Sequence, residues 1–116
     1  MKSIIVSMIT AAGLMAAGSA LATDMPPLAK KNSCNACHAI DHKVVGPAWM
    51  DVSKQYKNAT VFVYRDKEYP LFEGLVQKVS HGGSGHWGSI PMPGNAPAVK
   101  DADIRQLVKF ILNLAK

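Results

Sequence analysis

Residues 34–38 read Cys34-Asn35-Ala36-Cys37-His38, and this CxxCH motif carries the strongest chemical signal in the chain. The spacing is typical of the covalent attachment of a c-type haem. Two thiols on one turn of chain can each bond a vinyl group on the same edge of a porphyrin, and the adjacent imidazole can reach the iron. Cys34 and Cys37 are the only cysteines among 116 residues. The motif predicts one covalently bound haem c, with His38 as an axial ligand of its iron.

Other uses of the two cysteines fit the sequence less well. A redox-active CxxC pair normally lies between a strand and a helix of a βαβ fold, and little in this sequence indicates a parallel sheet. A zinc site would need two further ligands, and His42, His81 and His86 do not form a second pair with finger-like spacing. A disulfide between Cys34 and Cys37 would close a very small ring and constrain almost nothing. A thiol oxidoreductase remains the weaker alternative.

The second face of the iron needs a ligand of its own, and Met92 is the best candidate. It lies between Pro91 and Pro93 in a loop dense in glycine and proline, over residues 80–97. The two prolines restrict the backbone around Met92, so little conformational entropy is lost in presenting its sulfur. A long loop in a small domain is usually functional. Ligation by His81 or His86 of the same loop is the alternative.

The N-terminal residues have the features of an export signal. Lys2 supplies a positive start, residues 4–17 are mostly apolar, and Ala20-Leu21-Ala22 is a small-x-small cleavage pattern. We therefore predict a cleaved signal peptide over residues 1–22 and one domain over residues 23–116. An uncleaved membrane anchor is the alternative, but no basic stop-transfer cluster follows the segment.

Composition excludes several classes of protein. Hydrophobic residues make up 48% of the chain, too many for a disordered protein. The formal net charge is +5, from 13 basic and 8 acidic residues. The basic residues form no long cluster with interleaved aromatics, so we expect no nucleic-acid partner. No apolar run of about 20 residues continues cleanly, which excludes a multi-span membrane protein.

Hydrophobic periodicity predicts four helical segments. They cover residues 28–33, 48–56, 71–79 and 101–115. Gly82-Gly83 should end the third, and Asp101 is the expected N-cap of the fourth. The stretch 60–64 (TVFVY) fits a strand, a helix or a packed loop.

Four blocks of sequence, in this order and spacing, resemble the small bacterial class I cytochromes c of the c-551/c-552 (cytochrome c8) type. The blocks are residues 34–41 (CNACHAID), 45–48 (VGPA), 82–88 (GGSGHWG) and 90–95 (IPMPGN). The resemblance implies an all-α fold, with short helices wrapped around one haem c and crossing N- and C-terminal helices. The stretch 58–72 looks longer than in the compact members, and Gly94 stands where a proline is common.

The resemblance also implies roles for four further residues of the haem pocket. The carbonyl of Pro47 would accept a hydrogen bond from His38. Trp87 would donate its indole N–H to a haem propionate, and Lys78 falls where a basic propionate partner is expected. Asn95 would form a hydrogen bond near the sulfur of the methionine ligand.

Taken together, these features predict a soluble periplasmic monohaem cytochrome that carries one electron at a time between respiratory redox partners. With His38 and Met92 on both faces of the iron, no site remains for a substrate, so we expect no enzymatic activity. We expect a monomer, without stable membrane insertion after cleavage, that binds redox proteins transiently. Lysines 30, 31, 43 and 78 could ring the haem edge and attract acidic docking surfaces. A haem sensor or peroxidase-like protein with a displaceable sixth ligand is the alternative.

Overall fold

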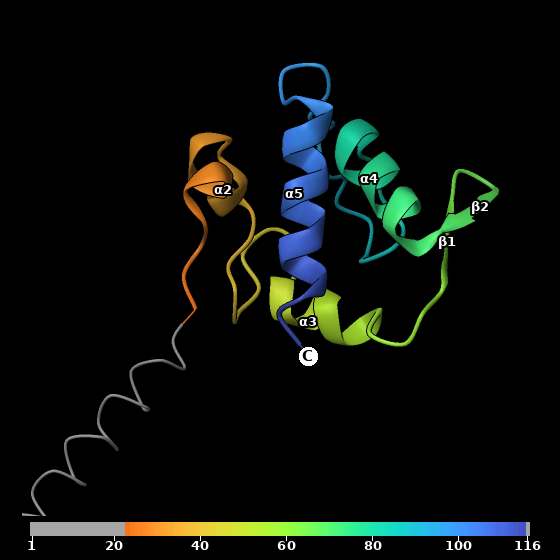
Figure 1. Ribbon diagram of the computed structural model, residues 1–116, viewed down its shortest axis with the longest axis horizontal. Coiled ribbons are helices and arrows are strands. Elements are labelled where there is room, and N and C mark those ends of the chain that lie inside the picture. Colours follow the sequence, from red (N-terminus) through yellow and green to blue (C-terminus); the bar gives the residue numbers. More distant parts are fainter. Residues whose placement is uncertain (1–22, 116) are drawn as a thin grey trace, which may run out of the picture.

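The computed structural model describes residues 23–115, and this part of the chain is mostly helical (Figure 1). The predicted signal peptide, residues 1–22, lies outside the described residues. The elements are α2 (Pro27–Lys31), the short 3-10 turn η1 (Cys34–Ala36), α3 (Trp49–Gln55), β1 (Val61–Tyr64), β2 (Lys67–Pro70), α4 (Leu71–His81) and α5 (Asp101–Leu112). The predicted helical class is confirmed. In residues 23–115 no helix is both long and apolar enough to cross a bilayer.

Helix α5 is the central element, between α2 on one side and α4 on the other (Figure 1). Its buried stripe consists of Ile104, Leu107 and Val108, as the periodicity predicts. Ile104 and Val108 belong to a hydrophobic cluster with α4 and β1, whereas Leu107 belongs to a second cluster with α2 and α3. The helix therefore joins two small cores rather than covering one.

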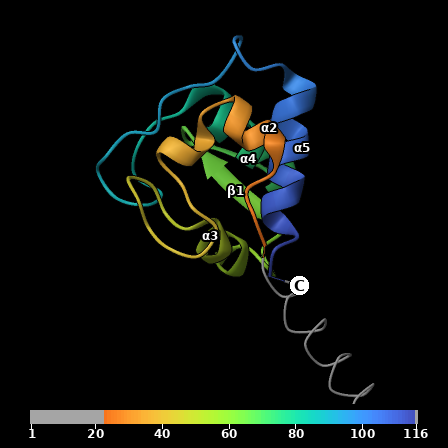
Figure 2. The same ribbon diagram turned by 90° about the vertical axis from the view of Figure 1, so that its left-hand side faces the viewer.

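The first and last helices of the described chain pack against each other, as the family resemblance implies (Figure 2). Pro27 occupies the first turn of α2, where its missing N–H costs no hydrogen bond. Ala29 is 0% exposed and lies in the cluster with Leu107. Its small side chain permits close approach of the two helices.

The stretch 60–64, which fits three conformations by sequence, contains the first strand of a β-hairpin. Strands β1 and β2 are antiparallel and joined by the two-residue turn Arg65-Asp66. Both turn residues have positive φ, 50° and 63°, as a type I′ turn requires. Phe62 and Tyr64 are buried against α4 while the alternate residues of β1 are exposed. The longer stretch 58–72 thus adds a small sheet to a helical fold.

The predicted N-cap of α5 is wrong. Asp101 is the first residue of the helix, and the capping position is Lys100, which makes no side-chain cap bond. The Asp101 carboxylate instead accepts a hydrogen bond from Nε of Arg105, one turn later, at 2.7 Å. An acidic residue in the first turn still interacts favourably with the helix dipole.

Candidate haem site

All eight residues predicted for the site line a single cavity of about 410 Å³. They are Cys34, Cys37, His38, Pro47, Lys78, Trp87, Met92 and Asn95. The segment after η1 and the loop after α4 run along the same side of the molecule (Figure 2) and supply much of the wall. Leu75 of α4 and Leu107 and Val108 of α5 supply apolar surface. Residues that are remote in sequence therefore meet around one mostly apolar space.

Local hydrogen bonds fold the CxxCH motif into a tight turn. The N–H of His38 donates to the carbonyl of Cys34 at 3.0 Å. The carbonyl of Cys37 accepts from the N–H of Gly46 at 2.7 Å and of Val45 at 3.2 Å. Both thiols are free, and burial raises the pKa of Cys34. The turn thus keeps both sulfurs on the cavity wall with their thiols unpaired.

The imidazole of His38 is held by one hydrogen bond and by close contacts to its ring. Its Nδ1 lies 2.8 Å from the carbonyl oxygen of Pro47. Because a carbonyl can only accept, Nδ1 must carry the proton, which leaves the Nε2 lone pair free for a metal. Trp49 lies 5.8 Å away, centroid to centroid, and a Cβ added at Gly46 would meet Cε1 of His38 at 2.5 Å. Burial lowers the pKa of His38, partly opposed by the hydrogen bond to Pro47, so the neutral imidazole is favoured.

Met92 is held by backbone pairing with the start of its own loop. The N–H of Gly83 donates to the carbonyl of Met92 at 2.9 Å, and the N–H of Met92 donates back at 3.0 Å. Gly82, with φ of 73°, approaches the Met92 carbonyl so closely that a Cβ at this position would clash with it. The Gly82-Gly83 pair, predicted as a helix stop, also closes the base of the loop over residues 82–92. This loop carries the predicted ligand, and we call it the ligand loop.

The other predicted pocket residues make contacts within the protein. Nζ of Lys78 donates to the carbonyl of Gly83 at 2.7 Å. Nδ2 of Asn95 donates to the carbonyl of Val79 at 2.9 Å. Trp87 is 41% exposed. Lys78 and Asn95 therefore fix the backbone around the ligand loop.

The histidines offered as alternative ligands are placed differently from Met92. His81 is the exposed last residue of α4. His86 lines the cavity, but its Nε2 lies 2.8 Å from the carbonyl of Val63 in β1 and its ring stacks on Phe62. His86 is thus bound to the hairpin.

Sequence reasoning missed one residue of this region, Tyr64. Its hydroxyl donates to the carbonyl of Gly82 at 2.7 Å in a buried contact. The alternating pattern of residues 60–64 indicates a strand, but no sequence signal indicates where that hydroxyl points.

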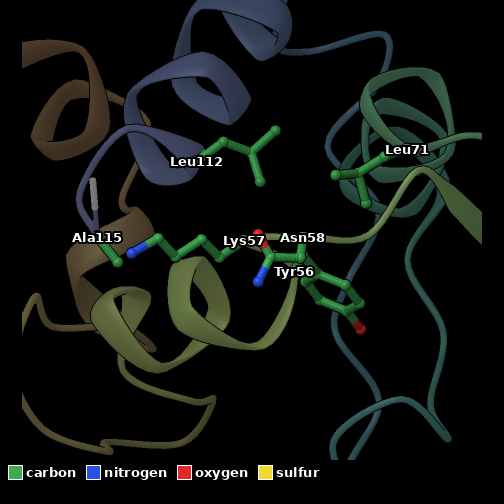
Figure 3. A pocket seen from close by; sticks show the side chains of 6 residues that line it. All are labelled: Tyr56, Lys57, Asn58, Leu71, Leu112 and Ala115. Atoms are coloured by element: carbon green, nitrogen blue, oxygen red, sulfur yellow. The ribbon is translucent and has the colours of Figure 1, made fainter.

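A smaller pocket of about 290 Å³ lies away from these residues, at the C-terminal ends of α3 and α5 (Figure 3). Its lining consists of Tyr56, Lys57, Asn58, Leu71, Leu112 and Ala115. Lys57 extends along it toward Ala115, so the pocket presents an amine and an apolar wall. Only Tyr56 also lines the larger cavity.

The larger cavity fits a covalently attached haem. It combines two free thiols, a neutral imidazole with one free nitrogen, a thioether and an apolar wall. Within residues 23–115 no group of three or more His, Cys, Asp or Glu side chains could hold a bare metal ion. Fold and site together define a protein of the c-type haem class.

Comparison with known proteins agrees with this class. Residues 16–115 match the family model for cytochrome c. The chain is 40% identical over 114 residues to cytochrome c-552 of Nitrosomonas europaea, covering 98% of this chain and 99% of that protein. It is 36% identical over 113 residues to cytochrome c-551 of Pseudomonas aeruginosa, covering 97% and 98%. The crystal structure of the Nitrosomonas europaea cytochrome superimposes with a TM-score of 0.63 at 42% identity, covering 75% of this chain and 95% of that one.

The chain belongs to the cytochrome c family. It is a monohaem c-type electron carrier with one covalently bound haem c. As an electron carrier it interacts with redox partners.

Proposed function

We propose that the protein is a soluble periplasmic cytochrome in which His38 and Met92 ligate the iron and Cys34 and Cys37 carry the haem. The observation that supports this best is that these four side chains line the same cavity. The engagement of His86 with the hairpin favours Met92 over a second histidine. When bound, the haem supplies one-electron chemistry by cycling between Fe(II) and Fe(III).

The protein residues around the site suit electron transfer better than catalysis. The Pro47 carbonyl fixes the His38 tautomer and increases the basicity of the free nitrogen. Methionine ligation and an apolar pocket both favour the ferrous state and raise the reduction potential. With His38 and Met92 both holding the iron, no coordination position would be left for a substrate, and we infer that the protein is not an enzyme.

Partner docking would use the basic residues near the cavity. Lys43 and Lys78 are part of its lining, and without residues 1–22 the chain has 12 basic and 8 acidic residues, a net charge of +4. A positive surface steers an acidic redox protein into a brief encounter and speeds association at low salt. We propose transient binding of acidic surfaces by a monomer, after removal of residues 1–22 on export.

Visible spectroscopy of the exported protein tests this function. Covalent haem that survives denaturing extraction is expected, with sharp reduced c-type bands and the weak far-red band of methionine-ligated ferric haem. Met92→Ala should abolish the far-red band while the haem stays attached. Met50→Ala, at a methionine of α3 outside the cavity lining, is the control and should leave the band unchanged. A wild-type protein without this band, or one that binds CO promptly when reduced, would contradict the proposal and favour a sensor or peroxidase-like role.

A further inference from the structure

The β-hairpin is joined to the loop that carries Met92 at two points. The Tyr64 hydroxyl donates to the carbonyl of Gly82 at 2.7 Å, where the loop begins. Farther along the loop, Nε2 of His86 lies 2.8 Å from the carbonyl of Val63. Both contacts come from adjacent residues of β1 and both involve loop residues between α4 and Met92. One strand therefore holds the loop at its base and near its middle.

Ring packing adds to the second contact. The His86 ring stacks on Phe62 with centroids 4.3 Å apart and planes 22° apart. Phe62 is buried in the core, and α4 packs on it so closely that a Cβ at Gly74 would meet its Cβ at 2.7 Å. Since the Val63 carbonyl only accepts, Nε2 of His86 carries the proton. His86 thus rests on a part of the hairpin that the core itself immobilises.

A short path leads from these contacts to the predicted ligand. Gly82 precedes Gly83, which exchanges two backbone hydrogen bonds with Met92. The Tyr64 hydroxyl thus binds the carbonyl of the same peptide group whose N–H, that of Gly83, donates to Met92. The loop between these points contains Gly85 and Gly88, both with positive φ, so it has little stiffness of its own. External contacts are needed to hold it.

We propose that the hairpin, residues 61–70, is a positioning element for the methionine ligand, with Tyr64 and His86 as its positioning residues. The proposal rests on the proposed function, in which Met92 ligates the iron. It assigns a role to the stretch 58–72, which the family resemblance leaves unexplained. Loss of either contact should let the loop open more often, so that an added ligand competes better with Met92.

Imidazole titration of the ferric holoprotein, followed by loss of the far-red band, tests the proposal. Tyr64→Phe and His86→Phe keep the ring packing and remove one hydrogen bond each. Each should increase the apparent imidazole affinity about five-fold, the factor that the net contribution of one hydrogen bond gives. His86→Gln can still donate to Val63 but loses the stacking on Phe62, so its gain in imidazole affinity should be smaller than that of His86→Phe.

Three controls separate positioning from general effects. Tyr69→Phe removes a hydroxyl from the other strand and should leave imidazole affinity unchanged. His42→Phe changes an exposed histidine whose ring is hydrogen-bonded to the neighbouring Asp41, and it should also have no effect. Val76→Ala, in the core, should lower the global unfolding midpoint without a comparable gain in imidazole affinity.

Equal imidazole affinity of the wild type, Tyr64→Phe and His86→Phe would overturn the proposal. A gain in Val76→Ala as large as in Tyr64→Phe would overturn it too, because general destabilisation would then explain the effect. If Tyr64→Phe fails to fold, the comparison of His86→Phe with His86→Gln carries the test. Failure of the proposed function has a different sign: the far-red band of the wild type would also be present in Met92→Ala, so Met92 would not be the ligand.

Discussion

Gly46→Ala should displace the His38 imidazole and destabilise the protein. A Cβ at this position would lie 2.5 Å from Cε1 of His38 and 3.0 Å from Nδ1, whereas ordinary contacts begin at 3.4 Å. The ring must therefore retreat by about 1 Å, which stretches its 2.8 Å hydrogen bond to Pro47 beyond bonding distance. Overpacking costs about 1–3 kcal/mol and the lost hydrogen bond about 1 kcal/mol, so we expect about 2–4 kcal/mol in all.

Thermal unfolding of the ferric holoprotein, followed by circular dichroism, measures this cost. In a domain of this size about 1 kcal/mol corresponds to about 4–8 °C, so Tm should fall by at least about 8 °C. Val44→Ala, at an exposed residue nearby that does not line the cavity, is the matched control and should change Tm little. A Gly46→Ala protein that melts within about 2 °C of wild type and keeps its visible spectrum would refute the packing of His38 on Gly46.

Three further changes test other parts of the structure. Ala29→Leu should overpack the contact between α2 and α5 and lower the free energy of unfolding by about 1–3 kcal/mol; an unchanged urea midpoint would contradict this packing. Asp66→Gly should relieve a residue with φ of 63° and raise the free energy of unfolding by about 0.5 kcal/mol, measured in the same way; a lower value would argue against the turn. The Arg105 guanidinium, which donates a hydrogen bond to Glu73, holds the pKa of this carboxyl group below its usual range. The ionised Glu73 therefore stabilises the folded state at pH values above its unfolded pKa. This stabilisation is lost as the pH falls through the lower, folded pKa. Glu73→Gln should therefore lower Tm at neutral pH and match wild type at about pH 2, and a pH-independent difference would exclude the linkage.

The chemistry of the site was the part most accessible from sequence. A covalently bound haem c requires two thiols for attachment and an adjacent imidazole for the iron, all at a fixed local spacing. Residues 34–38 therefore indicate this cofactor without knowledge of the fold. Met92 could be predicted as the second ligand because two prolines flank it in a breaker-rich loop. The helices were predictable to within a few residues, since their apolar residues recur at helical spacing and Gly82 ends α4.

Contacts between distant residues were not accessible in the same way. The turn of the hairpin uses Arg65 and Asp66 in the left-handed region, where Asn-Gly or Asp-Gly is the usual signal. The burial of Ser53 in α3 was also not predictable, because serine is polar and its neighbours in sequence do not indicate a buried position. Its hydroxyl donates to Leu112 and accepts from Ala115, which satisfies backbone groups at the end of α5. Neither partner can be inferred from the neighbours of Ser53 in sequence.

The contacts around the ligand loop share one physical feature. Four side chains each make a hydrogen bond to a backbone carbonyl, either of the loop or of an element beside it. They are Lys78, Tyr64, His86 and Asn95. A glycine-rich loop loses much conformational entropy when it is ordered, and these hydrogen bonds offset that loss at separate points. We expect these contacts to open without unfolding the two cores on α5, so exchange of the proposed methionine ligand should follow local opening of the loop rather than global stability. The far-red band should then respond to changes in Tyr64 or His86 under conditions where the helices remain intact.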